Sequence, residues 1–137
     1  MTEPLGEGTA GSSLVLAADD PRGLACFYGA LVGWPPKQGL GPGHWQLTLP
    51  GAGLLELYAP SARRPQRRQL GRLALCLRRE GDGATLQRWL AEARRQGASL
   101  VDGPRREPFG WEAWLLDPER NRLLLLVQPP APAEQAP

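Results

Sequence analysis

The chain has 137 residues, a length that suits one domain of ordinary size with enough apolar residues to bury a core. Hydrophobic residues make up 42% and charged residues 22%, which is typical of a soluble globular protein and excludes a largely disordered chain. The net charge of +2 is too small to indicate nucleic-acid binding, and the longest apolar run, 123–127, is too short to cross a bilayer. Because no secretory signal is visible either, we expect a cytoplasmic protein with no nucleic-acid and no membrane partner.

The first half of the chain predicts a strand, a helix and three further strands. Residues 13–18 form a short apolar run that suits a strand. Asp20 and Pro21 predict the start of the helix, since aspartate is a favoured N-cap and proline fits the first helical position; Gly33 predicts its end. Four apolar residues recur at helical spacing and predict one buried helix face: Leu24, Phe27, Tyr28 and Leu31. Strands are predicted between turns rich in proline and glycine, over 34–38, 44–49 and 54–58.

The second half repeats this order. A strand is predicted over 72–77, and Asp82 or Thr85 is expected to cap a helix that ends at Gly97. The apolar helix face has the same spacing as the first: Leu86, Trp89, Leu90 and Ala93. Three strands are predicted to follow, over 99–102, 111–116 and 123–127. The cap and the helix face both lie 62 residues after their counterparts, because 82 − 20 and 86 − 24 both equal 62. The sequence therefore predicts an internal repeat of strand-helix-strand-strand-strand.

The repeat divides the chain into two βαβββ modules, over 13–60 and 71–128, which are joined by a polar, arginine-rich linker over 61–70. Residues 1–12 are expected to form a flexible lead and residues 129–137 a disordered tail. Each module has one amphipathic helix, which covers one face of its sheet, so the other face must be buried or must line a cavity. We therefore predict an α+β fold in which the tandem modules form a curved eight-stranded mixed sheet with helices on the outside and an inner cleft.

Three segments of the sequence resemble those of a known superfamily when they are taken in order and at this spacing. They are Asp20–Trp34, with Phe-Tyr and Leu-Val-Gly-Trp; Gly71–Leu75; and 108–121, where Pro-Phe-Gly-Trp precedes Asp-Pro-Glu-Arg-Asn. They resemble the first-module helix, the second-module opening strand and the closing hairpin of the glyoxalase/bleomycin-resistance/extradiol dioxygenase (vicinal oxygen chelate) superfamily. The resemblance covers about residues 13–128 and implies the fold, but fold does not by itself specify function.

The resemblance also implies where a metal would be held. Metal-using members supply His, a carboxylate, His and Glu from the first, fourth, fifth and eighth strands, and the corresponding residues here are Ser13, Glu56, Arg72 and Leu124. Glu56 is the single suitable ligand among them, because an arginine repels a cation and a leucine offers no lone pair. The alignment of Arg72 depends on an apparent insertion at 80–83. We therefore expect no metal and no other cofactor, which disfavours metal-dependent glyoxalase or dioxygenase activity. His44 is interpreted as a surface or edge residue.

The same positions are expected to line the inner cleft, because residues at period two share one face of a strand. Glu56 and Arg72 are the candidate catalytic residues, and we expect them to face each other where the metal would sit. Trp111 and Trp114 differ in parity, so at most one of them is expected to face the cleft. The predicted ligand-binding residues are Ser13, Trp45, Glu56, Tyr58, Arg72, Trp111, Trp114 and Leu124.

Three functions stay open at this point. The first is a metal-free protein that binds a small, partly aromatic molecule in the cleft, since aromatic walls bind planar ligands by area and stacking. The second is a metal-independent lyase or isomerase, with Glu56 as base and Arg72 stabilising charge. The third is a non-catalytic structural or regulatory dimer. Homo-oligomers are usually two-fold symmetric, so a homodimer is expected, with modules paired either within one chain or across two.

Overall fold

A computed structural model of the chain describes residues 11–51, 53–68 and 71–131. The chain divides into two compact units between Gln66 and Arg67, a position inside the range predicted as the linker. Most of the lead predicted over 1–12 and of the tail predicted over 129–137 lies outside the described residues. None of the helices in the described part of the chain is long and apolar enough to span a membrane.

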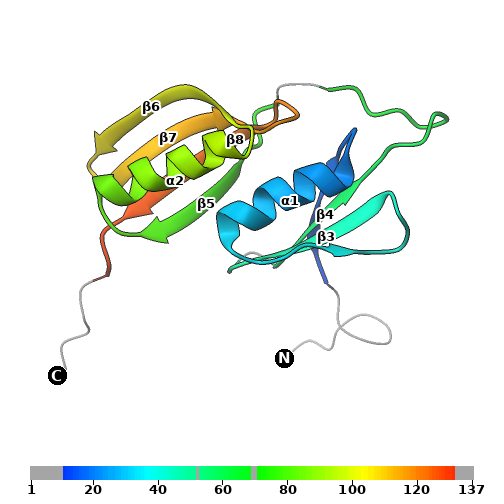
Figure 1. Cartoon of the computed structure of the whole chain (residues 1–137), viewed down its shortest axis with the longest axis horizontal. Helices are drawn as coiled ribbons and strands as arrows, with labels where there is room; N and C mark the ends of the chain where they lie inside the picture. Colours follow the sequence, from blue (N-terminus) through cyan, green and yellow to red (C-terminus); the bar gives the residue numbers. More distant parts are fainter. Residues whose placement is uncertain (1–10, 52, 69–70, 132–137) are drawn as a thin grey trace, which may run out of the picture. The chain divides into compact units, whose positions relative to one another are not determined.

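The first unit is a four-stranded mixed sheet with one helix packed against it (Figure 1). Its elements in chain order are β1 (Ser13–Ala17), α1 (Pro21–Val32), β2 (Lys37–Gln38), β3 (His44–Leu49) and β4 (Gly53–Tyr58). The strand order is β1-β4-β3-β2, with β1 parallel to β4 and the other neighbours antiparallel. The strand predicted over 34–38 is shorter than expected, because the backbone N–H of Trp34 donates to the carbonyl of Gly29 and two prolines follow it.

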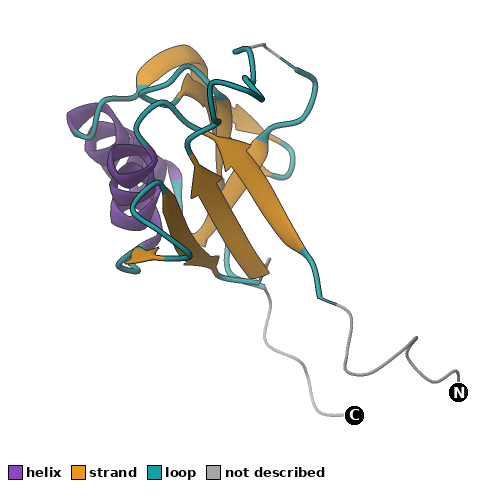
Figure 2. Ribbon diagram, turned by 90° about the vertical axis from the view of Figure 1, so that its right-hand side faces the viewer, coloured by secondary structure: helices purple, strands orange, loops and turns teal. Residues whose placement is uncertain are grey.

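The second unit has the same topology. Its elements are β5 (Leu75–Glu80), α2 (Gly83–Arg95), β6 (Ser99–Glu107), β7 (Gly110–Leu116) and β8 (Arg122–Gln128). The strand order is β5-β8-β7-β6, with β5 parallel to β8 and the other neighbours antiparallel. In each unit the helix and the strands form separate layers (Figure 2, helices purple and strands orange). The predicted α+β fold of tandem βαβββ modules is confirmed.

Both helices begin at the caps that the sequence indicates. The Asp20 carboxylate accepts a hydrogen bond from the backbone N–H of Gly23, and Gly33 ends α1 with a φ of 79°, a left-handed conformation that favours glycine. In α2 the cap is Asp82, and Thr85 completes a reciprocal capping box with it. The sequence left open whether Asp82 or Thr85 caps the helix, and the structure shows that both residues take part in the cap.

The core of each unit lies between its helix and one face of its sheet. In the first unit it is formed by Leu24, Phe27, Tyr28, Leu31, Leu47, Leu49, Leu55 and Leu57. In the second it is formed by Leu77, Leu86, Trp89, Leu90, Ala93, Ala113, Leu115, Leu123, Leu125 and Val127. Burying one such leucine contributes about 1.5–3 kcal/mol. Both predicted helix faces are therefore confirmed as core, and each sheet keeps a second face that its own helix does not cover.

Candidate functional site

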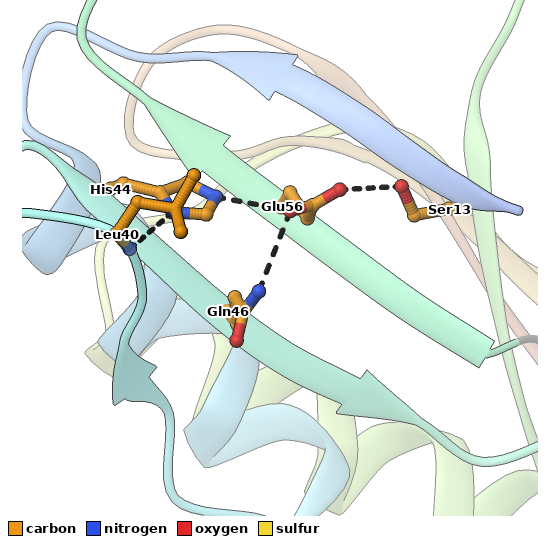
Figure 3. A network of polar contacts seen from close by, with 5 residues as sticks. All are labelled: Ser13, Leu40, His44, Gln46 and Glu56. Carbon is orange, nitrogen blue, oxygen red and sulfur yellow. Dashed lines mark hydrogen bonds and ion pairs between the residues drawn. The ribbon is translucent and has the colours of Figure 1, made fainter.

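Four polar side chains gather on the face of the first unit's sheet that α1 does not cover (Figure 3). Residues alternate between faces along a strand, so the burial of Leu47 and Leu57 against α1 turns Gln46 and Glu56 to the opposite face. Gln46 lies directly opposite Glu56 in the antiparallel pair of β3 and β4. Ser13 on β1 and His44 on β3 lie on the same face and complete the group. We call these four residues the Glu56 cluster.

Glu56 is the centre of this cluster, because the other three side chains all contact its carboxylate. The Ser13 hydroxyl donates to Oε2 over 2.5 Å, and the Gln46 amide donates to Oε1 over 3.4 Å. The His44 Nε2 lies 3.1 Å from Oε1. Side chains from the two flanking strands, β1 and β3, thus converge on one carboxylate of β4, which still exposes 25% of its side chain.

The orientation of the His44 ring is fixed by the loop that precedes β3. The backbone N–H of Leu40 donates to His44 Nδ1 over 2.8 Å, so Nδ1 is an acceptor and the ring proton on Nε2 can donate to Glu56. Gly39 makes this close approach possible, since a Cβ on that residue would lie 2.2 Å from Nδ1. Both ring nitrogens therefore have partners, and the imidazole serves to hold the carboxylate.

These contacts set the charge of the site. The Ser13 hydroxyl is the main cause of a lowered Glu56 pKa, with smaller contributions from Gln46 and His44, and partial burial opposes them. Glu56 therefore stays ionised throughout the neutral range, and as a base it is weaker than an ordinary glutamate. The arrangement is chemically suited to accept hydrogen bonds from a ligand, or to attract a cation, at a fixed anionic point.

The strand registers correct the predicted position of Arg72. In the first unit Val15 lies opposite Glu56, and Ser13 is two residues earlier. In the second unit Cys76 lies opposite Leu124, so the counterpart of Ser13 is Ala74. Arg72 is exposed and precedes β5, which runs from Leu75 to Glu80 and not over 72–77 as predicted. Equivalent positions differ by 61 residues in the opening strands and by 62 at the helix caps, so the second module has one extra residue before its helix.

The residues present do not fit the metal site that the fold family implies. The four positions carry Ser13, Glu56, Ala74 and Leu124, and two of these side chains are hydrocarbon. In the described ranges, no three or more His, Cys, Asp or Glu side chains come together as a metal would need. One carboxylate with one histidine that is already hydrogen-bonded is a poor set for a divalent ion, which requires about four protein or water ligands.

The other predicted residues of the first unit lie on different sides of the sheet. Tyr58 is half-buried and lies opposite His44 in the register, on the same face as the Glu56 cluster. Trp45 lies on the other face: the Arg22 guanidinium of α1 sits 5.8 Å from its ring, and its indole N–H donates to the carbonyl of Pro42. Ser13, Glu56 and Tyr58 therefore share one face of the sheet, whereas Trp45 lies on the opposite face, which α1 covers.

The second unit separates its two tryptophans in the same way, which confirms their predicted difference in parity. Trp114 lies opposite Leu124 on the face that α2 does not cover, and the Arg122 guanidinium sits 5.0 Å from its ring. Trp111 lies on the helix side, since its indole closely approaches Gly83 in the first turn of α2. Arg72 belongs to this unit and Glu56 to the other, so their expected pairing stays a prediction.

His44 and Gln46 are the site residues that the sequence did not indicate. His44 was expected at a surface or an edge, and Gln46 was not singled out. A usable signal was present, since 44–49 and 54–58 flank a short turn with Pro50, Gly51 and Gly53, and pairing the two strands across it places Gln46 opposite Glu56. The contact between His44 and the Leu40 backbone depends on loop geometry that no strand pattern specifies.

Comparisons with known proteins agree with this architecture. The model of the family described as glyoxalase-like domain matches residues 13–126. A glyoxalase/bleomycin resistance protein/dioxygenase family enzyme from Burkholderia phytofirmans PsJN has a similar structure, with a TM-score of 0.68, 19% identity, and 85% of this chain and 97% of that chain covered. A glyoxalase-related enzyme from Fulvimarina pelagi is similar with a TM-score of 0.69 and 18% identity, and the match covers 93% of this chain and 95% of that chain. A lactoylglutathione lyase from Agrobacterium tumefaciens is similar with a TM-score of 0.59 and 21% identity, and the match covers 89% of this chain and 96% of that chain. No curated protein matches the chain.

Proposed function

This chain belongs to the glyoxalase-like domain family, and on that premise we propose that it binds a small, partly aromatic molecule without a metal, through a hydrogen-bond donor on the ligand that contacts Glu56. The observation that carries the proposal is the Glu56 cluster itself. An ionised carboxylate held by Ser13, His44 and Gln46 on an uncovered sheet face is a pre-organised acceptor. Pre-organisation favours binding, because less conformational freedom is lost when the ligand arrives.

The surroundings of Glu56 define the ligand more closely. Each carboxylate oxygen offers two lone pairs, and Oε2 accepts one hydrogen bond, from Ser13, among the described residues. A ligand N–H or O–H can use the second lone pair. Val15, opposite Glu56 on β1, exposes 62% of its surface, and Tyr58 is half-buried on the same face. A protonated amine attached to an apolar or aromatic body would satisfy both the charge and these apolar neighbours.

The geometry supports binding better than base catalysis. A general base is most effective when its pKa lies near the working pH, and the hydrogen bonds to Glu56 move its pKa in the other direction. His44 is no substitute as a base, because the Leu40 backbone N–H already occupies the lone pair of Nδ1. The metal-independent lyase or isomerase with Glu56 and Arg72 therefore ranks below the binding protein. A dimer remains part of the proposal, and sedimentation measurements would test it.

A matched pair of variants tests the proposed function. Purified protein is screened by thermal shift against small aromatic amines, with benzylamine and the neutral benzyl alcohol as defined probes. Glu56→Gln removes the charge and keeps the shape, whereas Glu92→Gln does the same to a carboxylate on α2 that is bonded to Arg95 and Gln96. We expect amines to stabilise the wild type and Glu92→Gln, and Glu56→Gln to weaken their affinity by about 10- to 100-fold, since a hydrogen bond to a charged group contributes about 1.5–3 kcal/mol.

Two results would overturn the proposal. Equal binding of the amine by the wild type and Glu56→Gln would show that the carboxylate is not the anchor. Stoichiometric zinc or nickel retained through purification, found by elemental analysis, would show that the protein builds a metal site in spite of its donor set. Turnover of a bound amine that disappears in Glu56→Gln would instead establish the enzymatic alternative.

A further inference from the structure

A groove of about 490 Å³ lies in the second unit, where β5 and β8 end. It is lined by the last three residues of β5, by Phe109 in the turn between β6 and β7, and by residues 128–131. Its volume falls in the range of about 300–1,000 Å³ that small-molecule sites occupy. All of its lining belongs to one unit, so the groove is defined by that unit alone.

The charge of the groove favours an anion. Arg78 and Arg79 contribute two guanidinium groups and Glu80 one carboxylate, so the lining has a formal charge of +1. The Arg79 guanidinium lies 4.7 Å from the ring of Trp89 on α2, which anchors it on the helix side of the strand. Arg78 alternates to the other face and is exposed. The lining thus has positive charge on both sides of one edge strand.

Apart from the Gln128 amide, the remaining lining is apolar and includes an aromatic ring. Phe109 is 47% exposed, and its carbonyl accepts a hydrogen bond from the Gln128 amide. Gly110 allows the turn to approach β8, because a Cβ on that residue would lie 2.2 Å from the carbonyl oxygen of Val127. The φ of Gly110 is 146°, a backbone conformation that also favours glycine. The turn that carries this exposed ring therefore lies close to β8, and Phe109 lines the groove together with Pro129 and Pro130.

We propose that this groove binds a small aromatic anion, with its ring against Phe109 and the prolines and its anionic group at the Arg78 guanidinium. Guanidinium groups form charge-assisted, often bidentate hydrogen bonds with carboxylates and phosphates, and aromatic rings bind each other by area and by edge or offset contacts. The shared chemistry covers aryl carboxylates and aryl phosphates. This site is independent of the proposed function at Glu56.

Titration of the ¹⁵N-labelled full chain with phenyl phosphate, followed by amide chemical shifts, tests the proposal. We expect saturable shifts at Phe109, Glu80 and Gln128. Inorganic phosphate and phenol, used as probes of each half alone, should bind at least about tenfold more weakly than phenyl phosphate, and benzoate should shift the same amides. Arg78→Ala should weaken binding by about tenfold or more, because it removes a charged hydrogen-bond partner.

Two controls keep the result specific. Arg88→Ala removes another exposed arginine, on α2 and outside the groove, and should leave the affinity unchanged. Glu80→Gln should strengthen binding by about two- to fivefold, since it removes a like charge, and a gain cannot come from misfolding. The proposal is overturned if phenyl phosphate gives no saturable shifts, if Arg88→Ala and Arg78→Ala lose equal affinity, or if Glu80→Gln weakens binding. Loss of the shifts in Glu56→Gln would also overturn the proposal, because a site formed by the second unit alone does not depend on that carboxylate.

Discussion

The two units share one topology and one kind of core, but their uncovered sheet faces differ completely. The registers make the positions comparable: Ser13, His44, Gln46 and Glu56 in the first unit correspond to Ala74, Glu112, Trp114 and Leu124 in the second. The first face is a hydrogen-bonded polar cluster around one carboxylate. At the same centre the second face has Leu124 with Trp114 beside it.

The difference shows which residues specify the fold and which are free to diverge. Leu57 and Leu125 occupy equivalent helix-facing positions and are both fully buried. One residue earlier in each strand, Glu56 and Leu124 have opposite chemistry. Because side chains alternate between faces, one face of each sheet keeps the fold while the other can acquire a site. The comparison predicts that variants on the two faces will behave in different ways.

The largest effect is expected on the shared, helix-facing side. Leu57→Ala and Leu125→Ala should each lower the free energy of unfolding by about 2–5 kcal/mol, because both leave a cavity in a closed core. Leu54→Ala, on the uncovered face of β4, should cost clearly less, since that side chain is half-buried. Urea denaturation followed by circular dichroism measures all three. A loss for Leu54→Ala as large as that for Leu57→Ala would contradict the division into a structural and a variable face.

A smaller effect is expected when the central residues of the two faces are exchanged. Leu124→Glu should lower the free energy of unfolding by about 1–3 kcal/mol, because it brings a carboxylate beside Trp114 and Cys76 without the donors that Glu56 has. Glu56→Leu should cost clearly less than Leu124→Glu, since its donors lie on an accessible face and can bond to water. Adding Ala74→Ser to Leu124→Glu should recover part of the loss if Ala74 is the counterpart of Ser13. No recovery would argue against the corrected alignment.

The fold could be predicted from the sequence because its signals are local. The caps at Asp20 and Asp82 and the apolar helix faces depend on spacings of a few residues, and both are confirmed. The opening of the second module was misplaced, because the apolar run of 73–77 suggests a strand that starts at Arg72, whereas the pairing with β8 begins at Leu75. Only the register with Leu124 identifies Ala74 as the residue at the site position.

The site could be predicted in part. Ser13 and Glu56 were singled out through the resemblance to the superfamily, whose metal-ligand positions on the first and fourth strands they occupy. His44 was missed, since a histidine after a glycine-rich loop has no periodic pattern, and its role depends on the Leu40 backbone. Trp45 was expected in the ligand site, but its parity with Leu47 places it beside α1, where Arg22 covers its ring. The aromatic side chain suggested that Trp45 contacts a ligand, but the alternation of side chains along β3 places it on the helix-facing side.

The smallest effect, and the one most specific to the first unit, is a shift in titration. The Glu56 carboxyl should titrate below its ordinary pKa of 4.5 in the folded protein, and the side-chain ¹³C shift measures this directly. A carboxyl with a pKa lowered by folding stabilises the native state above its unfolded pKa, and this contribution disappears as the pH falls through the folded pKa. The stability difference between the wild type and Glu56→Gln should therefore be constant above about pH 5 and decrease below pH 4.5.

Ser13→Ala should raise the pKa of Glu56 more than Gln46→Ala, because the hydroxyl makes the largest contribution. The reverse order would mean that the amide and not the hydroxyl is the main donor to the carboxylate on which the proposed binding site depends.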